Sequence, residues 1–113
     1  MPALRSVEVS PAELRAMFDA DRIENRHAIG ELSIIVLKSH DARPELHMPP
    51  GTLSQLVAYV DGAGNHLAVA HRYLKPDGTL AASGRPDPKV LRRGDTLYKP
   101  WWGGRPTITT SSD

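Results

Sequence analysis

The chain contains no cysteine among its 113 residues. This absence excludes a disulfide framework, a thiolate zinc site, an iron–sulfur cluster and a cysteine nucleophile. It is typical of proteins from a reducing compartment, so we expect a cytoplasmic protein. No residue pattern indicates a bound cofactor, and we expect none.

Long apolar stretches are also lacking. A membrane-spanning helix needs about 18 or more consecutive apolar residues, and a run such as Ile34–Leu37 is far too short. The first apolar stretch is interrupted by Arg5 and Glu8, so it does not have the pattern of a secretory signal peptide. We therefore expect no membrane partner.

Familiar catalytic signatures are a third absence. No glycine-rich run leads into a Lys-Ser/Thr helix start, and no Ser-His-Asp order can be assigned. The sequence therefore favours neither dinucleotide chemistry nor a serine nucleophile. The net charge is +1, yet residues 1–60 carry six basic and eight acidic side chains, whereas residues 61–113 carry eight and five. The second half is mildly basic, which suits a polyanion such as RNA.

What is present indicates a folded α+β protein. With 40% hydrophobic and 24% charged residues, the composition is that of a globular domain. Ser10 is followed by Pro11 and Glu13, which is the pattern of a capped helix start. Apolar side chains then recur at helical spacing, at Leu14, Met17 and Phe18. We predict a helix from Pro11 to about Asp21, and residues 22–30 either extend it or form a linker.

The rest of the pattern favours strands joined by turns. We expect strands over residues 31–39, 53–60, 66–74 and 79–83, and then a hairpin or kinked strand over 90–93 and 96–99. The run Ile34–Leu37 is β-branched and apolar on both faces, which predicts a central strand covered by the helix. Residues 40–51 contain three prolines and predict a long loop.

This order of elements predicts an α+β fold. We expect an N-terminal helix packed on a mostly antiparallel, four- to five-stranded sheet with the topology of a meander. Turns rich in Gly, Asn and Asp, at 61–65 and 75–78, separate the strands. We expect one domain over residues 1–102 and a flexible C-terminal tail over 103–113, because the chain after Trp102 is rich in Gly, Ser and Thr.

His71 is the first candidate for chemistry. Strand alternation places it on one face with Leu67, Val69 and Tyr73, so it continues an otherwise apolar row. A histidine at the end of a buried row can act as a general acid or base, because burial and nearby charge move its pKa into the working range. The competing interpretation is a histidine at the edge of the core that only bonds to the backbone.

The segment His40–His47 is the second candidate. It offers two imidazoles, two carboxylates and the guanidinium of Arg43 within eight residues. A metal site using His40, Asp41 and His47 would need imidazoles that converge on one point and leave a position for water. The spacing matches no metalloenzyme pattern, so we expect no metal and favour a solvated polar loop.

The segment Ser83–Lys89 is the third candidate. Arg85 and Lys89 on this proline-stiffened backbone could bind a phosphate, with Arg85 contacting it through two N–H groups. The competing interpretation is that Asp87 pairs with Arg85 at the surface, where ion pairs are weak.

Further candidates for binding are two arginines and a pair of tryptophans: Arg43, Arg72, Trp101 and Trp102. One tryptophan ring can close the core. An exposed ring would mark a contact with a partner or with a nucleobase.

The string His71–Thr79, continued by Ala82–Lys89, is more specific than its Pro-Asp-Gly turn alone. It resembles a segment of small uncharacterised bacterial proteins. The resemblance covers less than a fifth of the chain. It implies no activity, and no catalytic role is carried over from it.

Two functions stay open, with a metal-binding domain as a third. The first is a small protein-binding or regulatory module, dimeric or with another protein partner, that docks through a sheet edge. The alternative is a metal-independent ribonuclease of the bacterial toxin type, which the order of helix and sheet resembles. In that mechanism His71 is the general base, Arg85 and Lys89 stabilise charge at phosphorus, and His47 protonates the leaving oxygen.

Overall fold

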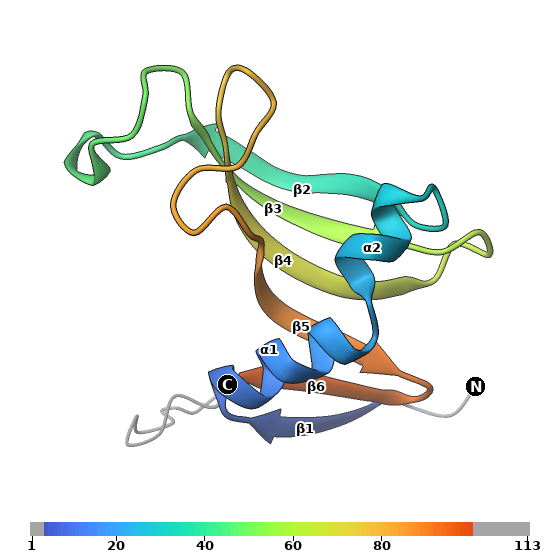
Figure 1. Cartoon of the computed structure of the whole chain (residues 1–113). Coiled ribbons are helices and arrows are strands. Elements are labelled where there is room, and N and C mark those ends of the chain that lie inside the picture. The colour runs from blue at the N-terminus through green and yellow to red at the C-terminus, as the bar shows by residue number, and fades with distance from the viewer. Residues whose placement is uncertain (1–3, 101–113) are drawn as a thin grey trace.

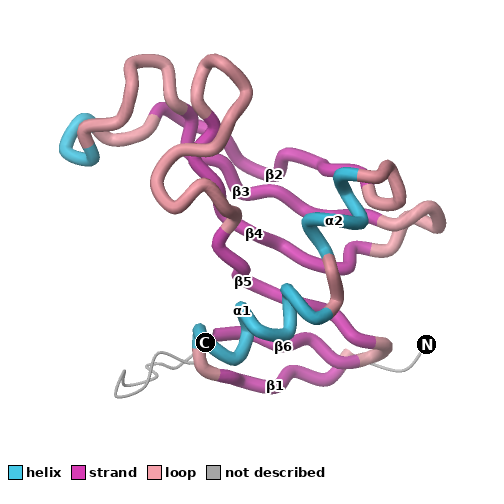
Figure 2. The backbone as a smooth tube through the Cα atoms, viewed as in Figure 1, coloured by secondary structure: helices cyan, strands magenta, loops and turns pink. Residues whose placement is uncertain are grey.

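The computed structural model describes residues 4–100, which form a six-stranded sheet with two α-helices on one face (Figures 1 and 2). The elements are β1 (Arg5–Val9), α1 (Pro11–Ala20), α2 (Ile23–Ala28), β2 (Ser33–Asp41), the 3₁₀ turn η1 (Pro44–Leu46), β3 (Leu53–Val60), β4 (His66–Leu74), β5 (Asp87–Arg93) and β6 (Thr96–Pro100). The strand order is β1-β6-β5-β4-β3-β2. Neighbouring strands are antiparallel except β1 and β6, which are parallel.

The start of α1 follows the predicted cap. The Ser10 hydroxyl accepts a bond from the Glu13 amide at 3.0 Å, and the Glu13 carboxylate accepts one from the Ser10 amide at 2.9 Å. Each satisfies an amide that the first helical turn leaves without a partner. After Ala20 the left-handed backbone of Arg22, with φ of 57°, redirects the chain into α2, so residues 22–30 contain a separate short helix. Neither helix within residues 4–100 is long and apolar enough to cross a membrane.

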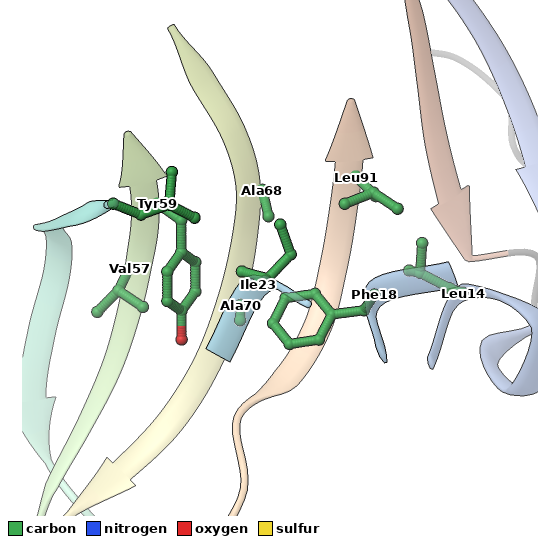
Figure 3. Packing of buried hydrophobic residues seen from close by; sticks show 9 residues of the cluster. Leu14, Phe18, Ile23, Val57, Tyr59, Ala68, Ala70 and Leu91 are labelled. Atoms are coloured by element: carbon green, nitrogen blue, oxygen red, sulfur yellow. The ribbon is translucent and has the colours of Figure 1, made fainter. Parts of the chain in front are cut away.

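The core lies between the helices and one face of the sheet (Figure 3). Phe18 of α1 meets the ring of Tyr59 edge-on, with 5.9 Å between the ring centroids. Leu14 of α1, Ile23 of α2 and Leu91 of β5 are at most 1% exposed. The sheet contributes small and large apolar side chains to this layer: Val57, Tyr59, Ala68, Ala70 and Leu91. Burial on this scale stabilises the fold by about 1.5–3 kcal/mol for each large side chain.

The β3–β4 hairpin has the predicted bounds of 53–60 and 66–74. The turn is closed by Asp61, whose carboxylate accepts bonds from the amides of Ala63 and Asn65 at 2.9 Å each. Gly64 has a φ of 88°, a left-handed backbone conformation that residues with a Cβ atom rarely adopt. The hairpin therefore forms from signals that lie within a short stretch of the chain.

The expected meander of four to five antiparallel strands is wrong in strand number and in sheet type, although the α+β class is confirmed. The sheet has six strands and is mixed, because β1 precedes the helix and pairs in parallel with β6. No local turn joins these strands, which lie almost a chain length apart, so a sequence pattern could not show their pairing.

The expectation that the run Ile34–Leu37 forms a central strand is wrong. Among the strands of residues 4–100, its strand, β2, pairs only with β3 and forms one edge of the sheet. Ile34 packs against the core, whereas Ile35, Val36 and Leu37 are 45%, 46% and 47% exposed. Apolar residues on both faces predict burial on both faces, but within residues 4–100 only Ile34 of this run packs on the core.

The strand expected over residues 79–83 is also wrong, since only an isolated bridge joins Leu74 to Leu80. The next strand, β5, begins at Asp87 and not at residue 90 as expected, so it includes Pro88. Pro88 lies opposite Ala70, where the register between β4 and β5 shifts. Irregular positions of this kind accommodate a residue without an N–H group. Residues 40 and 41 continue β2, so the long loop begins only at Ala42.

Replacing Phe18 by alanine should lower the free energy of unfolding by about 3–5 kcal/mol, because it leaves a cavity in the core. The control Ile29→Ala, at a residue 68% exposed at the end of α2, should change it by less than about 0.5 kcal/mol. Urea denaturation followed by circular dichroism measures both. Equal losses for the two variants would contradict the assignment of the core.

Candidate functional site

A pocket of about 380 Å³, here called the His71 pocket, opens on the sheet face opposite the helices. Val57 and Ala70 point into the core, so strand alternation turns Ser54 and His71 to the other face. The pocket is lined by residues of β2, β3, β4 and the loop after β2: His40, Arg43, Leu46, Ser54, His71 and Tyr73. His71 was expected at the end of a buried row, but the core row of β4 is the one with Ala68 and Ala70, and His71 lies on the face that the helices do not cover.

The pairing register brings the polar side chains of the pocket together. His40 lies opposite Ser54, and Ser54 lies opposite Tyr73, so three adjacent strands each contribute one residue to a row. His71 is two positions before Tyr73 on the same face. Its Nε2 lies 2.7 Å from the Ser54 hydroxyl oxygen, and its ring meets Tyr73 edge-on with 4.6 Å between centroids. The imidazole of His71 is therefore held in one orientation.

The second imidazole of the pocket is also oriented. The Nδ1 of His40 lies 3.0 Å from the backbone carbonyl oxygen of Asp41. A carbonyl oxygen only accepts, so Nδ1 carries the hydrogen and Nε2 is the nitrogen that can exchange a proton. The Nε2 of His40 is therefore the nitrogen that is available to a ligand.

Burial, more than nearby charge, makes His71 a base. Burial lowers the pKa of His71, and the nearby cations of Lys89 and His40 lower it further, while Asp87 partly opposes them. The imidazole is therefore neutral at pH 7 and able to accept a proton. The surrounding cations also favour an anionic ligand.

Several predicted site residues lie at or beside this pocket. Arg43 lines it, at the loop that follows β2. Asp87 lies opposite His71 in the register of β4 and β5. The ammonium of Lys89 donates to the Asp87 carboxylate at 2.9 Å, so Asp87 pairs with Lys89 and not with Arg85.

Arg85 lies on the helix side of the sheet. Its guanidinium donates to the carboxylates of Asp19 and Glu24, and these bonds raise the pKa of Arg85. The guanidinium of Arg15 also reaches this segment, donating to the carbonyl oxygen of Pro86. These contacts tie the loop before β5 to α1 and α2, so the structure does not bring Arg85 to His71.

The remaining predicted residues lie elsewhere. Arg72 is on the helix side of β4, where its Nε donates to the Gln55 side-chain oxygen at 2.9 Å. His47 is exposed at the end of η1 and does not line the His71 pocket. Trp101, Trp102 and the expected tail over 103–113 lie outside the described residues.

A metal site finds no geometric support in residues 4–100. No group of three or more His, Asp or Glu side chains there is close enough to hold a metal ion. His40 and Asp41 are successive residues of β2, so their side chains leave opposite faces of the strand.

Ser54 and the role of His40 beside it were not found from the sequence. The hairpin could be recognised, and counting back from its turn would place Ser54 opposite Arg72. A register shift between Tyr59 and Val60 moves the pairing by one residue, so Ser54 lies opposite Tyr73 and contacts His71. A one-residue shift exchanges the two faces of a strand, and no pattern in the sequence predicts this register shift.

Comparison of the chain with protein-family models, curated proteins and solved structures finds no match in any of the three. The chemistry of the pocket therefore follows from its own residues. It combines a neutral imidazole, a second imidazole and a guanidinium around a space of about 380 Å³. Such a set can bind an anion and move protons to and from it.

We predict that His71 titrates below the ordinary histidine pKa of about 6.5, because burial disfavours its charged form. NMR titration of the ring protons measures this pKa directly. With a lowered folded-state pKa, the unfolded chain binds more protons, so the stability from neutral His71 is present above about pH 6.5 and is lost as pH falls through the folded-state value. His71→Gln should remove that pH dependence, and His66→Gln, at the exposed start of β4, should keep it.

Proposed function

We propose that this protein is a metal-independent ribonuclease whose catalytic centre is the His71 pocket. The observation that supports this best is the convergence of His71, His40 and Arg43 on one pocket. RNA carries its own nucleophile, the 2′-hydroxyl, so its cleavage needs only a base, an acid and positive charge at the phosphate. The chain offers these three groups together.

The proposed reaction has two proton transfers, one from the substrate to His71 and one from His40 to the substrate. His71 Nε2 takes the proton of the 2′-hydroxyl, and the 2′-oxygen forms a bond to phosphorus. The bond from phosphorus to the 5′-oxygen breaks, and His40 in its imidazolium form donates a proton from Nε2 to that oxygen. Arg43 binds the non-bridging oxygens, where charge increases in the transition state. The products are a 2′,3′-cyclic phosphate and a 5′-hydroxyl.

In this proposal His40 replaces His47 as the general acid, and Arg43 replaces Arg85 as the group that stabilises charge at phosphorus. Neither of the latter lines the pocket, and Arg85 is bound to two carboxylates on the other side of the sheet. Lys89 was also expected to stabilise charge at phosphorus, but it does not line the pocket, and its charge instead lowers the pKa of His71. In the free protein the Ser54 hydroxyl oxygen lies 2.7 Å from His71 Nε2, and the substrate hydroxyl would take its place.

The test is cleavage of a labelled single-stranded RNA in the presence of EDTA. His71→Ala should reduce the rate by about 10²–10⁴-fold, the usual contribution of a general base, whereas the control His66→Ala on the same strand should retain it. Product analysis should give the cyclic phosphate. No cleavage by well-folded wild-type protein, or full cleavage by His71→Ala, would overturn the proposal.

Two further variants separate the roles in the same assay. His40→Ala should lose cleavage of ordinary RNA but recover it on RNA with a 5′-bridging sulfur, because thiolate leaves without a proton. Ser54→Ala should keep ribonuclease activity. If instead Ser54→Ala and His71→Ala abolish hydrolysis of an ester substrate, the pair would be a serine nucleophile and its base.

A second candidate function, self-association through β2, is favoured by the exposed edge of the sheet. β2 is nine residues long, and three successive apolar side chains of it are exposed: Ile35, Val36 and Leu37. Proteins usually protect such edges with charge, proline or short length. The other edge, β1, is only five residues long and carries Arg5 and Glu8.

The partner we propose for β2 is a second copy of this chain. The apolar centre of β2 is flanked by Ser33 and Lys38. In an antiparallel pair of copies with a two-fold axis at Val36, Ile35 of one copy lies opposite Leu37 of the other, and Lys38 lies opposite Ile34. This arrangement matches apolar with apolar at the centre and keeps the two lysines apart.

Val36→Lys should convert a dimer into a monomer in sedimentation velocity, because it places like charges opposite each other at the axis. The matched control is Val7→Lys on the opposite edge strand β1, which should leave the dimer intact. A wild-type protein that stays monomeric at high micromolar concentration would overturn this second candidate.

A further inference from the structure

A second pocket, of about 570 Å³, lies in the loop between β2 and β3. Its lining is mainly apolar and comes from Met48 and the loop prolines, and it is called here the Met48 pocket. The residue that the Met48 pocket shares with the His71 pocket is Arg43. The two pockets therefore adjoin at Arg43, the residue that we propose to bind the scissile phosphate.

The loop around the Met48 pocket is built by specific contacts. The Ala42 amide donates to the Thr52 carbonyl oxygen at 2.9 Å, which closes the base of the loop. The buried hydroxyl of Thr52 donates to the Pro49 carbonyl oxygen at 2.7 Å. Gly51 takes a φ of 88°, and a Cβ there would lie 3.0 Å from the Pro76 ring of the turn after β4. The loops at this end of the sheet therefore pack on each other (Figure 1).

We infer that the Met48 pocket binds the nucleobase adjacent to the scissile phosphate, which makes single-stranded RNA the substrate. This inference rests on the proposed ribonuclease function. A phosphate on Arg43 in the His71 pocket puts the next nucleotide of the strand beside the Met48 pocket. A base packs well against a thioether and proline rings, since every base offers a flat apolar face.

The single-stranded class follows from access. A base inside a duplex is stacked on its neighbours and paired with the other strand, so it does not enter a side pocket unless it is unstacked. A single-stranded base is free to do so. Asp41 also lines the pocket, and a carboxylate offers acceptors for the N–H groups of a base edge.

The test is binding, measured separately from cleavage. The probe is a fluorescein-labelled, 2′-O-methyl single-stranded oligonucleotide, which cannot be cleaved because its 2′-oxygen is blocked. Met48→Glu should weaken its binding about tenfold or more in fluorescence anisotropy at fixed salt, and Met48→Ala should weaken it less. The control Ile29→Glu, at a side chain 68% exposed on the helix side, makes the same charge change and should have little effect. A duplex of the same sequence should bind wild type more weakly.

The outcomes separate this inference from the proposed function. If Met48→Glu binds the probe as well as Ile29→Glu does, or if the duplex binds as tightly as the single strand, the base-binding pocket is wrong. If the wild-type protein nevertheless cleaves RNA, the proposed ribonuclease function is retained. If Met48→Glu loses binding while wild type never cleaves RNA, the pocket stands and the catalytic proposal fails. Wild-type protein that does not bind the probe at all overturns the inference.

Discussion

Packing of the two helices on one face of the sheet is the constraint on which the rest of the molecule depends. Phe18 against Tyr59 and Ile23 in the same cluster commit that face to the core (Figure 3). Ala70 lies in this core, so the next residue, His71, must point to the other face. The packing of the helices on the sheet thus decides which face the proposed catalytic centre occupies, although the helices do not contact that centre.

The cations of the chain are divided between the two faces. On the helix side, Arg85 is bound by Asp19 and Glu24, and Arg93 is bound by Asp21 at 2.9 Å. On the open face, Arg43 and the two histidines line a pocket with no carboxylate in its lining. A net charge of +1 therefore says little about affinity for RNA. The local distribution decides it, because screening limits each charge to its surroundings.

The two proposed functions share one strand. His40 lies near the end of β2 and lines the His71 pocket, while the middle of β2 carries the exposed apolar edge. A second copy paired to that edge would restrict the motion of β2 and so hold His40 in place. The loop with Arg43 follows β2 directly, so it would be held by the same pairing. Self-association and catalysis are therefore compatible in this fold.

The sequence by itself determined the elements whose signals are local. The cap at Ser10 set the start of α1, the turn at Asp61 set the β3–β4 hairpin, and alternation grouped His71 with Leu67, Val69 and Tyr73. Which of the two faces the helices cover did not follow from alternation, since the core holds Ala68 and Ala70 instead. Only the tertiary structure decided what depends on distant segments: the parallel pairing of β1 with β6, the edge position of β2, and the meeting of Ser54 and His40 with His71. The reason is physical. Capping and turn bonds join residues a few positions apart, whereas strand order and a one-residue register shift are set by packing across the whole sheet.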